Sequence, residues 1–122
     1  MIIRTSLENR EIVSILTRKF NLGSENHISR IAFSYSITHQ YKLNLNEIEN
    51  SKGKEYSKSV FFGNNYELYV AMICVKYNIH SSDIDIPKYI KMHVDDGLKS
   101  INEITTRDNY SAGIDLISGL IS

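Results

Sequence analysis

The sequence predicts a small, mainly α-helical protein: a single domain with about four helices and a short N-terminal strand. Apolar residues recur every three or four positions in four stretches, which is the pattern of helices that bury one face. Gly23, Gly63 and Pro87 fall at the edges of these stretches, where helices end or begin. A chain of 122 residues with 42% hydrophobic content is long enough to bury one core and too short for two ordinary domains.

The first 37 residues are expected to form a strand followed by two helices. Residues 2–6 are mostly β-branched, which favours a brief strand. Thr5 and Glu8 have the spacing of a capping box, so a first helix should begin there and stop before Gly23. Ser24 is a suitable N-cap residue for the second helix.

The second half of the chain is expected to contain two further helices. Residues 38–54 are polar and predict a connection, and residues 55–62 form a weak strand candidate. A third helix should span residues 64–77, and because apolar side chains wrap most of it, we expect it near the centre of the core. A fourth helix should start around Pro87, which is tolerated in a first turn.

These elements predict a domain over residues 1–104 and a C-terminal tail over residues 105–122. The tail has five apolar residues that suit a short helix docked on this domain or on a neighbouring chain: Ile114, Leu116, Ile117, Leu120 and Ile121.

Composition excludes several classes of protein. The formal net charge is zero, but residues 1–61 carry nine basic and six acidic side chains, whereas residues 62–122 carry five basic and eight acidic ones. This asymmetry permits a polyanion-binding surface or head-to-tail self-association. Cys74 is the single cysteine, so the chain cannot form an internal disulfide or hold an iron–sulfur cluster alone. No apolar run is long enough to span a bilayer and no signal-peptide pattern opens the chain, so we expect a cytoplasmic protein.

No pattern of catalytic or metal-ligating residues stands out. The four histidines lack the spacing of a metal site, and no phosphate-binding loop or nucleophile elbow is present. We interpret Cys74 as an inert core thiol, His93 as a packing or interface residue, and Asp95 with Asp96 as part of a solvated helix face. The sequence therefore predicts no catalytic residue, no metal, no cofactor and no enzymatic activity.

Two groups of residues are candidates for binding a phosphate backbone. The Gly-Ser turn before the second helix exposes the first N–H groups of that helix, with the Ser24 hydroxyl and the Arg30 guanidinium close in sequence. The alternative is that Ser24 only caps its own helix. The second group combines the end of the first helix with the polar connection and strand candidate, interleaved with tyrosines, and consists of Arg18, Lys19, Lys42, Lys52, Lys54 and Lys58. These lysines could equally be solvent-facing surface residues.

Three segments resemble the DNA sulfur-modification protein DndE family in order and spacing. They are FNLGSENHISRIAFSYSI (20–37), GKEYSKSVFFGNNYELYVAMICVKY (53–77) and IPKYIKMHVDDGLKSI (86–101). The residues that match the family pattern are Arg30, Ala32, Ser36 and Ile37 in the first segment, Gly53, Glu55, Tyr56, Gly63 and Tyr69 in the second, and His93 and Gly97 in the third.

The resemblance implies a small helical protein that forms a homotetramer and binds duplex DNA, preferentially nicked, through peripheral lysines. It implies partners in the sulfur-modification machinery: a cysteine desulfurase, an iron–sulfur sulfurtransferase component and a larger ATPase-like subunit. It also implies an N-terminal half similar to ribbon–helix–helix proteins. The leading hypothesis is thus a non-catalytic DNA-binding accessory subunit of the phosphorothioation machinery.

Two other functions remain open at the level of the sequence. The first is a ribbon–helix–helix transcriptional regulator, in which the N-terminal strand would pair with that of a second copy and enter the major groove. The second is a pure assembly subunit whose contact with DNA is incidental, which the apolar third helix and tail would suit.

Overall fold

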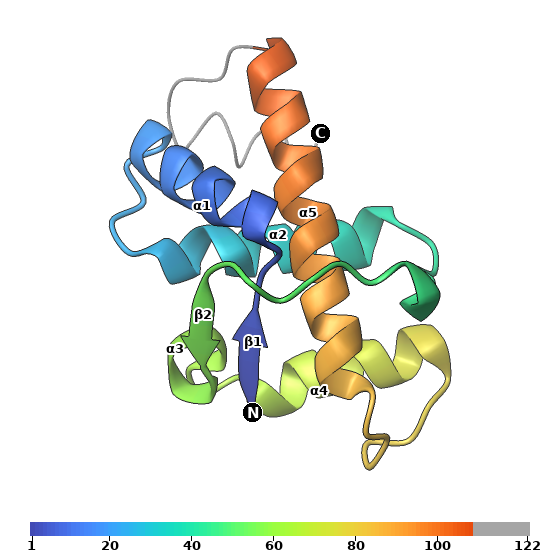
Figure 1. Cartoon of the computed structure of the whole chain (residues 1–122). Helices are drawn as coiled ribbons and strands as arrows, with labels where there is room; N and C mark the ends of the chain where they lie inside the picture. The colour runs from blue at the N-terminus through green and yellow to red at the C-terminus, as the bar shows by residue number, and fades with distance from the viewer. Residues whose placement is uncertain (109–122) are drawn as a thin grey trace.

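Residues 1–108 are described by the computed structural model, and they form five α-helices, one 3-10 helix and a two-stranded sheet (Figure 1). In chain order the elements are β1 (Ile2–Arg4), α1 (Leu7–Lys19), α2 (Glu25–His39), η1 (Leu45–Glu47), β2 (Glu55–Ser57), α3 (Lys58–Phe62), α4 (Tyr66–Tyr77) and α5 (Ile86–Asp108). The predicted mainly helical fold with a strand–helix–helix start is confirmed. The expected domain boundary at residue 104 falls within α5, and the remaining tail with its expected docking helix lies outside the described residues.

The sheet joins the start of the chain to its middle. β1 pairs antiparallel with β2, which places Ile3 opposite Tyr56. Both side chains point into the core, at 1% and 2% exposure. Their neighbours Arg4 and Glu55 point outward and form an ion pair of 2.7 Å. The strand that a ribbon–helix–helix dimer would share with a second copy is therefore paired within its own chain.

The N-cap of α1 is Ser6, not Thr5 as the capping-box spacing predicted. The Ser6 hydroxyl accepts a hydrogen bond of 3.2 Å from the backbone N–H of Asn9. Thr5 extends the sheet pairing instead, because its N–H donates to the Lys54 carbonyl and its hydroxyl accepts from the Lys54 N–H. Since Thr5 is used by the sheet, the helix begins one residue later than the pattern indicated.

The strand candidate over residues 55–62 is only half right. β2 ends at Ser57, whose hydroxyl accepts from the Val60 N–H and caps the short helix α3. Phe61 and Phe62 are both fully buried. Consecutive residues of a strand point to opposite faces, so a strand could have buried only one of these rings on one side. A helical turn directs both rings into the core.

The central helix is α5, so the expectation that residues 64–77 form the centre of the core is wrong. α5 makes its most extensive contact with α2 and also touches α1, α4 and β1. α4 crosses one end of α5 (Figure 1) and leaves Leu68 54% and Val75 83% exposed. Apolar residues around a whole helix do not reveal which of its faces the rest of the chain covers.

α2 and α5 approach closely where Gly97 meets Ala32. A Cβ atom added to Gly97 would lie 1.9 Å from the Ala32 carbonyl oxygen, which is well inside contact distance. The absence of a side chain at Gly97 therefore sets the spacing of the two longest helices.

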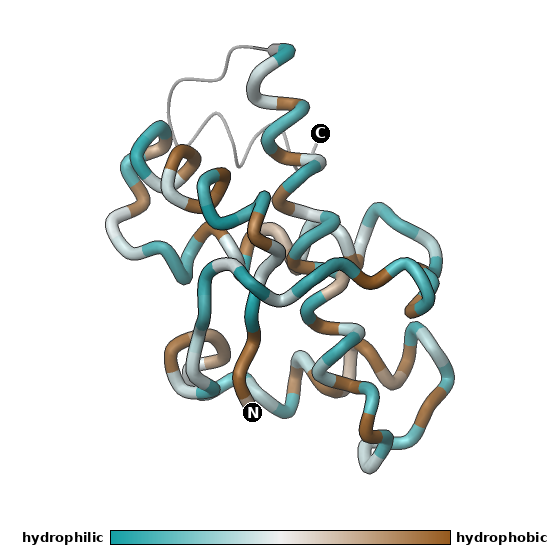
Figure 2. Tube along the Cα trace, in the orientation of Figure 1, coloured by the Kyte–Doolittle hydropathy of each residue, from teal (hydrophilic) through white to brown (hydrophobic). Residues whose placement is uncertain are grey.

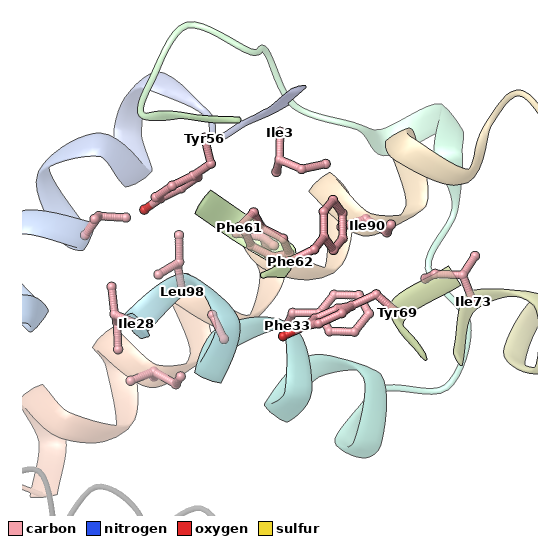
Figure 3. Packing of buried hydrophobic residues seen from close by; sticks show 14 of the residues in the cluster. Ile3, Ile28, Phe33, Tyr56, Phe61, Phe62, Tyr69, Ile73, Ile90 and Leu98 are labelled. Atoms are coloured by element: carbon pink, nitrogen blue, oxygen red, sulfur yellow. The ribbon is translucent and has the colours of Figure 1, made fainter. Parts of the chain in front are cut away.

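The aromatic part of the core lies beside this crossing (Figure 3). The Tyr69 ring is central to it, because its centroid lies 4.9 Å from Phe33, 5.6 Å from Phe61 and 5.2 Å from Phe62. These rings come from three helices, so α2, α3 and α4 meet at one point of the core.

Asp95 on α5 is a buried anchor for the start of α1. Its carboxylate accepts from the Ser6 N–H at 2.9 Å and from the Asn9 side-chain amide at 2.8 Å, and it forms an ion pair with Lys91. Asp95 is 3% exposed. The interpretation of Asp95 as part of a solvated face is therefore wrong, because the backbone donors of the β1–α1 junction require an acceptor at this depth, whereas Asp96 is half-buried.

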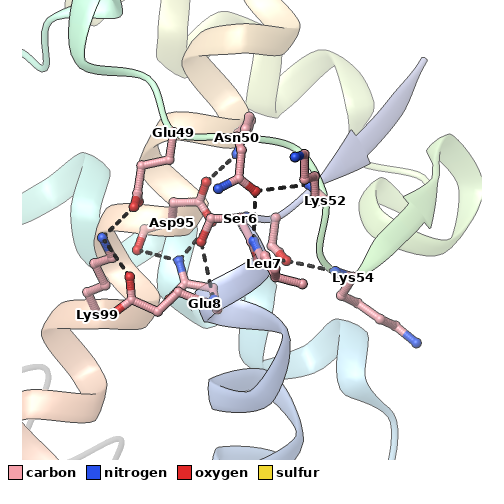
Figure 4. Close-up of polar contacts among 12 residues, drawn as sticks. Ser6, Leu7, Glu8, Glu49, Asn50, Lys52, Lys54, Asp95 and Lys99 are labelled. Carbon is pink, nitrogen blue, oxygen red and sulfur yellow. Dashed lines mark hydrogen bonds and ion pairs between the residues drawn. The ribbon is translucent and has the colours of Figure 1, made fainter.

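The connection after α2 is fastened to the same region (Figure 4). The Asn50 side-chain oxygen accepts from the Leu7 N–H at 2.9 Å. Lys99 donates to Glu49 at 2.6 Å and lies 3.7 Å from Glu8, and the hydrogen bond with Glu49 raises the pKa of Lys99. These contacts hold residues 49–54 against α1 and α5, so that β2 can reach β1.

We predict that Gly97→Ala lowers the free energy of unfolding by about 1–3 kcal/mol, because overpacking forces the helices apart. Urea denaturation measures this change. Glu103→Ala, at an exposed position of the same helix, is the matched control and should change stability little. A stabilised Gly97→Ala protein, as helix propensity alone would give, contradicts the close crossing.

Candidate nucleic-acid interface

A hollow of about 380 Å³ lies where α2 begins, beside β2 and α3. Of the candidate binding residues, Ser24 and Lys54 line it together; the other lining residues are Gly23, Glu25, Asn26, Glu55, Tyr56, Ser57 and Val60. The turn after α1 and the strand β2 are distant in sequence, and the tertiary fold brings them to one place.

Ser24 has N-cap backbone geometry, but its hydroxyl makes no capping hydrogen bond with α2. The interpretation of Ser24 as a side-chain cap is therefore wrong. Because Ser24 is exposed, its hydroxyl can donate to a group in the hollow, next to the N–H groups of Glu25 and Asn26 at the start of the helix; the His27 N–H already donates to the Ser24 carbonyl at 3.2 Å.

Glu25 sets the electrostatics of the hollow. Partial burial alone would raise the pKa of Glu25, but hydrogen bonds from Ser14 and Lys54 outweigh it and lower that pKa. The Lys54 ammonium lies 3.2 Å from the Glu25 carboxylate. An anion entering the hollow must therefore compete with Glu25 for Lys54.

Tyr56 lines the hollow and connects β2 to α2 by hydrogen bonds. Its hydroxyl lies 2.7 Å from the Ser29 hydroxyl and donates to the Glu25 carbonyl at 3.0 Å. Burial raises the pKa of Tyr56 to about 12, so the phenol stays protonated and can keep donating. Because Tyr56 is tied to the first two turns of α2, the position of Lys54 relative to Ser24 is fixed.

Arg30 has a structural role. Its guanidinium donates to the Phe61 carbonyl at 2.5 Å and to the Val60 carbonyl at 2.9 Å. These carbonyls belong to the last turn of α3, which has few intrahelical partners for them. Arg30 thus links α3 to α2.

Lys52 and Lys58 flank the hollow in sequence, and both are exposed. The Lys58 ammonium lies 4.0 Å from the centroid of the Tyr66 ring. Lys54 lies between them, and all three precede or enter α3, so the region around β2 is the most cationic segment of the candidate surface.

The remaining candidates lie elsewhere. Arg18 is exposed at the end of α1, and Lys19 donates to the Thr105 carbonyl of α5 at 3.3 Å. Lys42 follows the end of α2, and a helix of 15 residues places it roughly 22 Å from Ser24 along the axis. The structure therefore brings Ser24 and Lys54 together, with Lys52 and Lys58 beside them, and does not bring Lys42 to the same place.

His93 belongs to a buried polar cluster rather than to a reactive site. Its Nδ1 lies 2.8 Å from the Ser36 hydroxyl and its Nε2 lies 2.7 Å from the Tyr77 hydroxyl. Ser36 also donates to Asp96 at 2.7 Å. Desolvation, with a smaller contribution from the Lys76 charge, lowers the pKa of His93 to about 4. The expected packing role of His93 is confirmed by its complete burial.

Two further observations concern residues 1–108. No group of three or more histidine, cysteine, aspartate or glutamate side chains among them could hold a metal ion. Within the same range, no helix has the length and apolar character needed to cross a membrane.

The fold is similar to that of two solved structures. The first is DndE from Escherichia coli B7A, described as involved in DNA phosphorothioation modification: the TM-score is 0.65, the sequence identity is 16%, and the match covers 82% of this chain and 95% of that one. The second is a double glycine-to-lysine mutant of DndE involved in DNA phosphorothioation, with a TM-score of 0.66, 17% identity, and coverage of 81% and 94%. A comparison with curated proteins found no match.

The chain thus has the fold of a class of small helical proteins associated with DNA phosphorothioation. A family model described as DNA sulphur modification protein DndE matches residues 2–108. The chain belongs to the DndE family.

The residues that carried the family resemblance in the sequence mostly stabilise the fold. Gly97 permits the helix crossing, and Tyr56 and Tyr69 anchor the sheet and the aromatic core. Gly53 lies against the β1–α1 junction, where an added Cβ atom would be 2.0 Å from the Ser6 carbonyl oxygen. The family pattern is therefore informative about architecture, and the lysines of the candidate interface lie outside it.

We predict that His93 makes stability depend on pH. The unfolded histidine titrates near 6.5 and the folded one near 4, so the unfolded state binds more protons between these values. The free energy of unfolding should therefore fall on acidification, by about 2 kcal/mol between pH 7 and pH 5. Denaturation of wild type and His93→Gln over this range measures the effect, and an equal pH dependence in both proteins contradicts it.

We predict that Arg30→Ala destabilises the fold and that Lys58→Ala does not. Removing Arg30 leaves the Phe61 carbonyl without its side-chain donor, at a cost of about 1–3 kcal/mol, whereas the Val60 carbonyl still accepts from the Asn26 amide at 3.1 Å. Lys58 is exposed, so its replacement should change the free energy of unfolding by less than about 0.5 kcal/mol. Thermal denaturation of the two variants checks this, and equal stabilities would exclude a structural role for Arg30.

Proposed function

We propose that this protein is a non-catalytic DNA-binding accessory subunit of the cytoplasmic phosphorothioation machinery. It binds duplex DNA, preferentially nicked, as a homotetramer. It acts beside the enzymes that mobilise sulfur and exchange it for a phosphate oxygen, including the iron–sulfur sulfurtransferase and ATPase-like components. The observation that carries the proposal is the family match over residues 2–108.

The hollow at the start of α2 supports a role in phosphate binding. A phosphate there would meet the Ser24 hydroxyl, the first N–H groups of α2 and the Lys54 ammonium. Lys52 and Lys58 would contact neighbouring phosphates, since both side chains are exposed on the adjacent segment. Such contacts position the protein on DNA without reading its sequence.

Glu25 lowers the affinity of this site for a phosphate group. Its carboxylate repels an incoming phosphate and holds Lys54 by an ion pair. Intact duplex DNA presents its phosphates on a stiff surface, whereas a break in one strand lets the backbone deform towards the hollow. This difference is the physical basis we propose for a preference for nicked duplex.

The alternative of a ribbon–helix–helix regulator has less support. Its reading element would be β1, and in this chain β1 is paired with β2 while Ile3 is buried in the core. Freeing β1 for a second copy would expose Ile3 and Tyr56.

We predict that the triple replacement Lys52→Ala, Lys54→Ala and Lys58→Ala weakens binding to nicked duplex DNA. For every lysine–phosphate pair that the replacement removes, the slope of log affinity against log salt should decrease by about 0.9, because fewer counterions are released. Gel shifts and fluorescence anisotropy on nicked, intact and single-stranded DNA, at several salt concentrations, measure affinity and slope.

The control for this experiment is Lys88→Ala, at an exposed lysine of α5 that pairs with Asp85 and lies outside the lining of the hollow. Circular dichroism should show that the triple variant keeps its fold. Unchanged binding by a folded triple variant would contradict the proposed binding surface. Sedimentation of the wild-type protein as a monomer would contradict the proposed tetramer.

A further inference from the structure

α4 has an apolar groove on its outer side. The groove has a volume of about 590 Å³ and is lined by Tyr66, Glu67, Val70, Ala71, Cys74, Val75, Ile79, His80 and Ser81. Val75 is 83% exposed. Figure 2 shows hydrophobic residues along α4. Exposed apolar surface that gathers in one hollow is typical of an interaction site rather than of scattered surface residues.

The opposite side of α4 is buried in the hydrophobic core. The Tyr69 ring packs against rings of α2 and α3, Ile73 is buried in the same hydrophobic cluster, and Tyr77 bonds to His93. α4 is therefore apolar on two sides, and within residues 1–108 only one of them is covered. The second side is suited to a partner that is itself apolar.

An apolar segment of this chain follows directly after the domain. The family model ends at residue 108, and the sequence then continues for 14 residues, with one charged residue, Asp115. Its apolar residues include Ile114, Ile117 and Ile121, which have the three-and-four spacing of one helix face.

The position of α5 makes docking on the same chain costly. The bond between Tyr77 and His93 places the C-terminal end of α4, and with it the groove, beside the first turns of α5. The tail starts after Asp108, at the opposite end of α5 (Figure 1). His93 and Asp108 are fifteen residues apart in α5, which corresponds to about 22 Å along the helix axis. The linker to Ile114 spans about the same distance only when fully extended. A tail seated on its own groove would thus need a stretched linker, with the associated loss of conformational entropy.

We propose that residues 114–121 of one copy dock in the α4 groove of a second copy. This inference rests on the self-association included in the proposed function and names the surface that would mediate it. A second copy can place its groove near the end of α5, so that the linker to the tail need not be stretched. Two copies can exchange tails about a two-fold axis, in which case each contributes the same segment and the same groove.

The single cysteine gives a direct test, because Cys74 is half-buried and lines the groove, rather than lying in the core as the sequence indicated. Full-length protein carrying Ile117→Cys and Cys74→Ala is mixed with tagged protein that retains Cys74, and the mixture is treated with a short bismaleimide. We expect a covalent heterodimer that joins the introduced thiol of one chain to Cys74 of the other.

Matched variants of the tagged chain test whether the groove mediates the cross-link. Val75→Glu should reduce the yield of heterodimer at least roughly tenfold, because it places a charge where an aliphatic side chain would be buried. Ile84→Glu is the control, because Ile84 is 89% exposed and lies outside the groove lining. Equal loss with both variants, or with neither, overturns the proposal.

Two further outcomes separate this proposal from the proposed function. A chain that carries Ile117→Cys together with native Cys74, and that cross-links internally at high dilution, shows docking on the same chain and overturns the exchange. If the heterodimer is absent while sedimentation still shows an oligomer and nicked DNA is still shifted, the tail proposal fails and the proposed function stands.

Discussion

The close crossing of α2 and α5 is the constraint on which the rest of the structure depends. Gly97 allows the backbone of α5 to rest on the Ala32 carbonyl, and this contact fixes the separation of the two longest helices. Other elements are attached to this pair. α1 and β1 are anchored to α5 through Asp95, and α3 is attached to α2 through Arg30. A small domain with few layers cannot absorb a change in that spacing, because its interior is close-packed.

Buried polar groups fix the relative orientation of the helices in this domain. Asp95 satisfies donors of the β1–α1 junction, and His93 joins hydroxyls from α2 and α4. Lys76, on the mostly apolar α4, donates to the Ile37 and Gln40 carbonyls at the end of α2. Each of these bonds is directional, so together they select one arrangement of helices that apolar packing alone would leave less defined.

The sequence allowed the helices to be predicted, but not the identity of the groups that join them. Periodic apolar residues located α1, α2, α4 and α5. They also indicated the buried face of each helix except α4, which is apolar almost all round. The consecutive rings of Phe61 and Phe62 were assigned to a strand, since periodicity is uninformative over five residues. Asp95 and Arg30 were assigned to solvent and to DNA, because charge suggests exposure unless the buried partner is known. The i, i+4 spacing of Lys91 and Asp95 was the one local signal of a buried ion pair.

The sequence identified residues of the candidate interface, but not which of them lie together in the fold. Ser24 and Lys54 are 30 positions apart, and they reach one hollow only in the tertiary structure, where β2 pairs with β1 and Tyr56 bonds to the start of α2. Sequence proximity suggested Arg30 as a phosphate ligand, and the tertiary structure directs its guanidinium to α3. Lys42 was grouped with the other lysines by composition alone, and the length of α2 separates it from them.

The pairing of β1 with β2 also bears on how the chain folds. The two strands are separated by 50 residues, so their contact closes a long loop and its entropy must be offset by interactions formed beforehand. α1 and α2, in contrast, are neighbours in sequence. We expect the helices to assemble first and the sheet to close last. The hollow at the start of α2, which needs β2 for one wall, would then be among the last parts of the molecule to take shape.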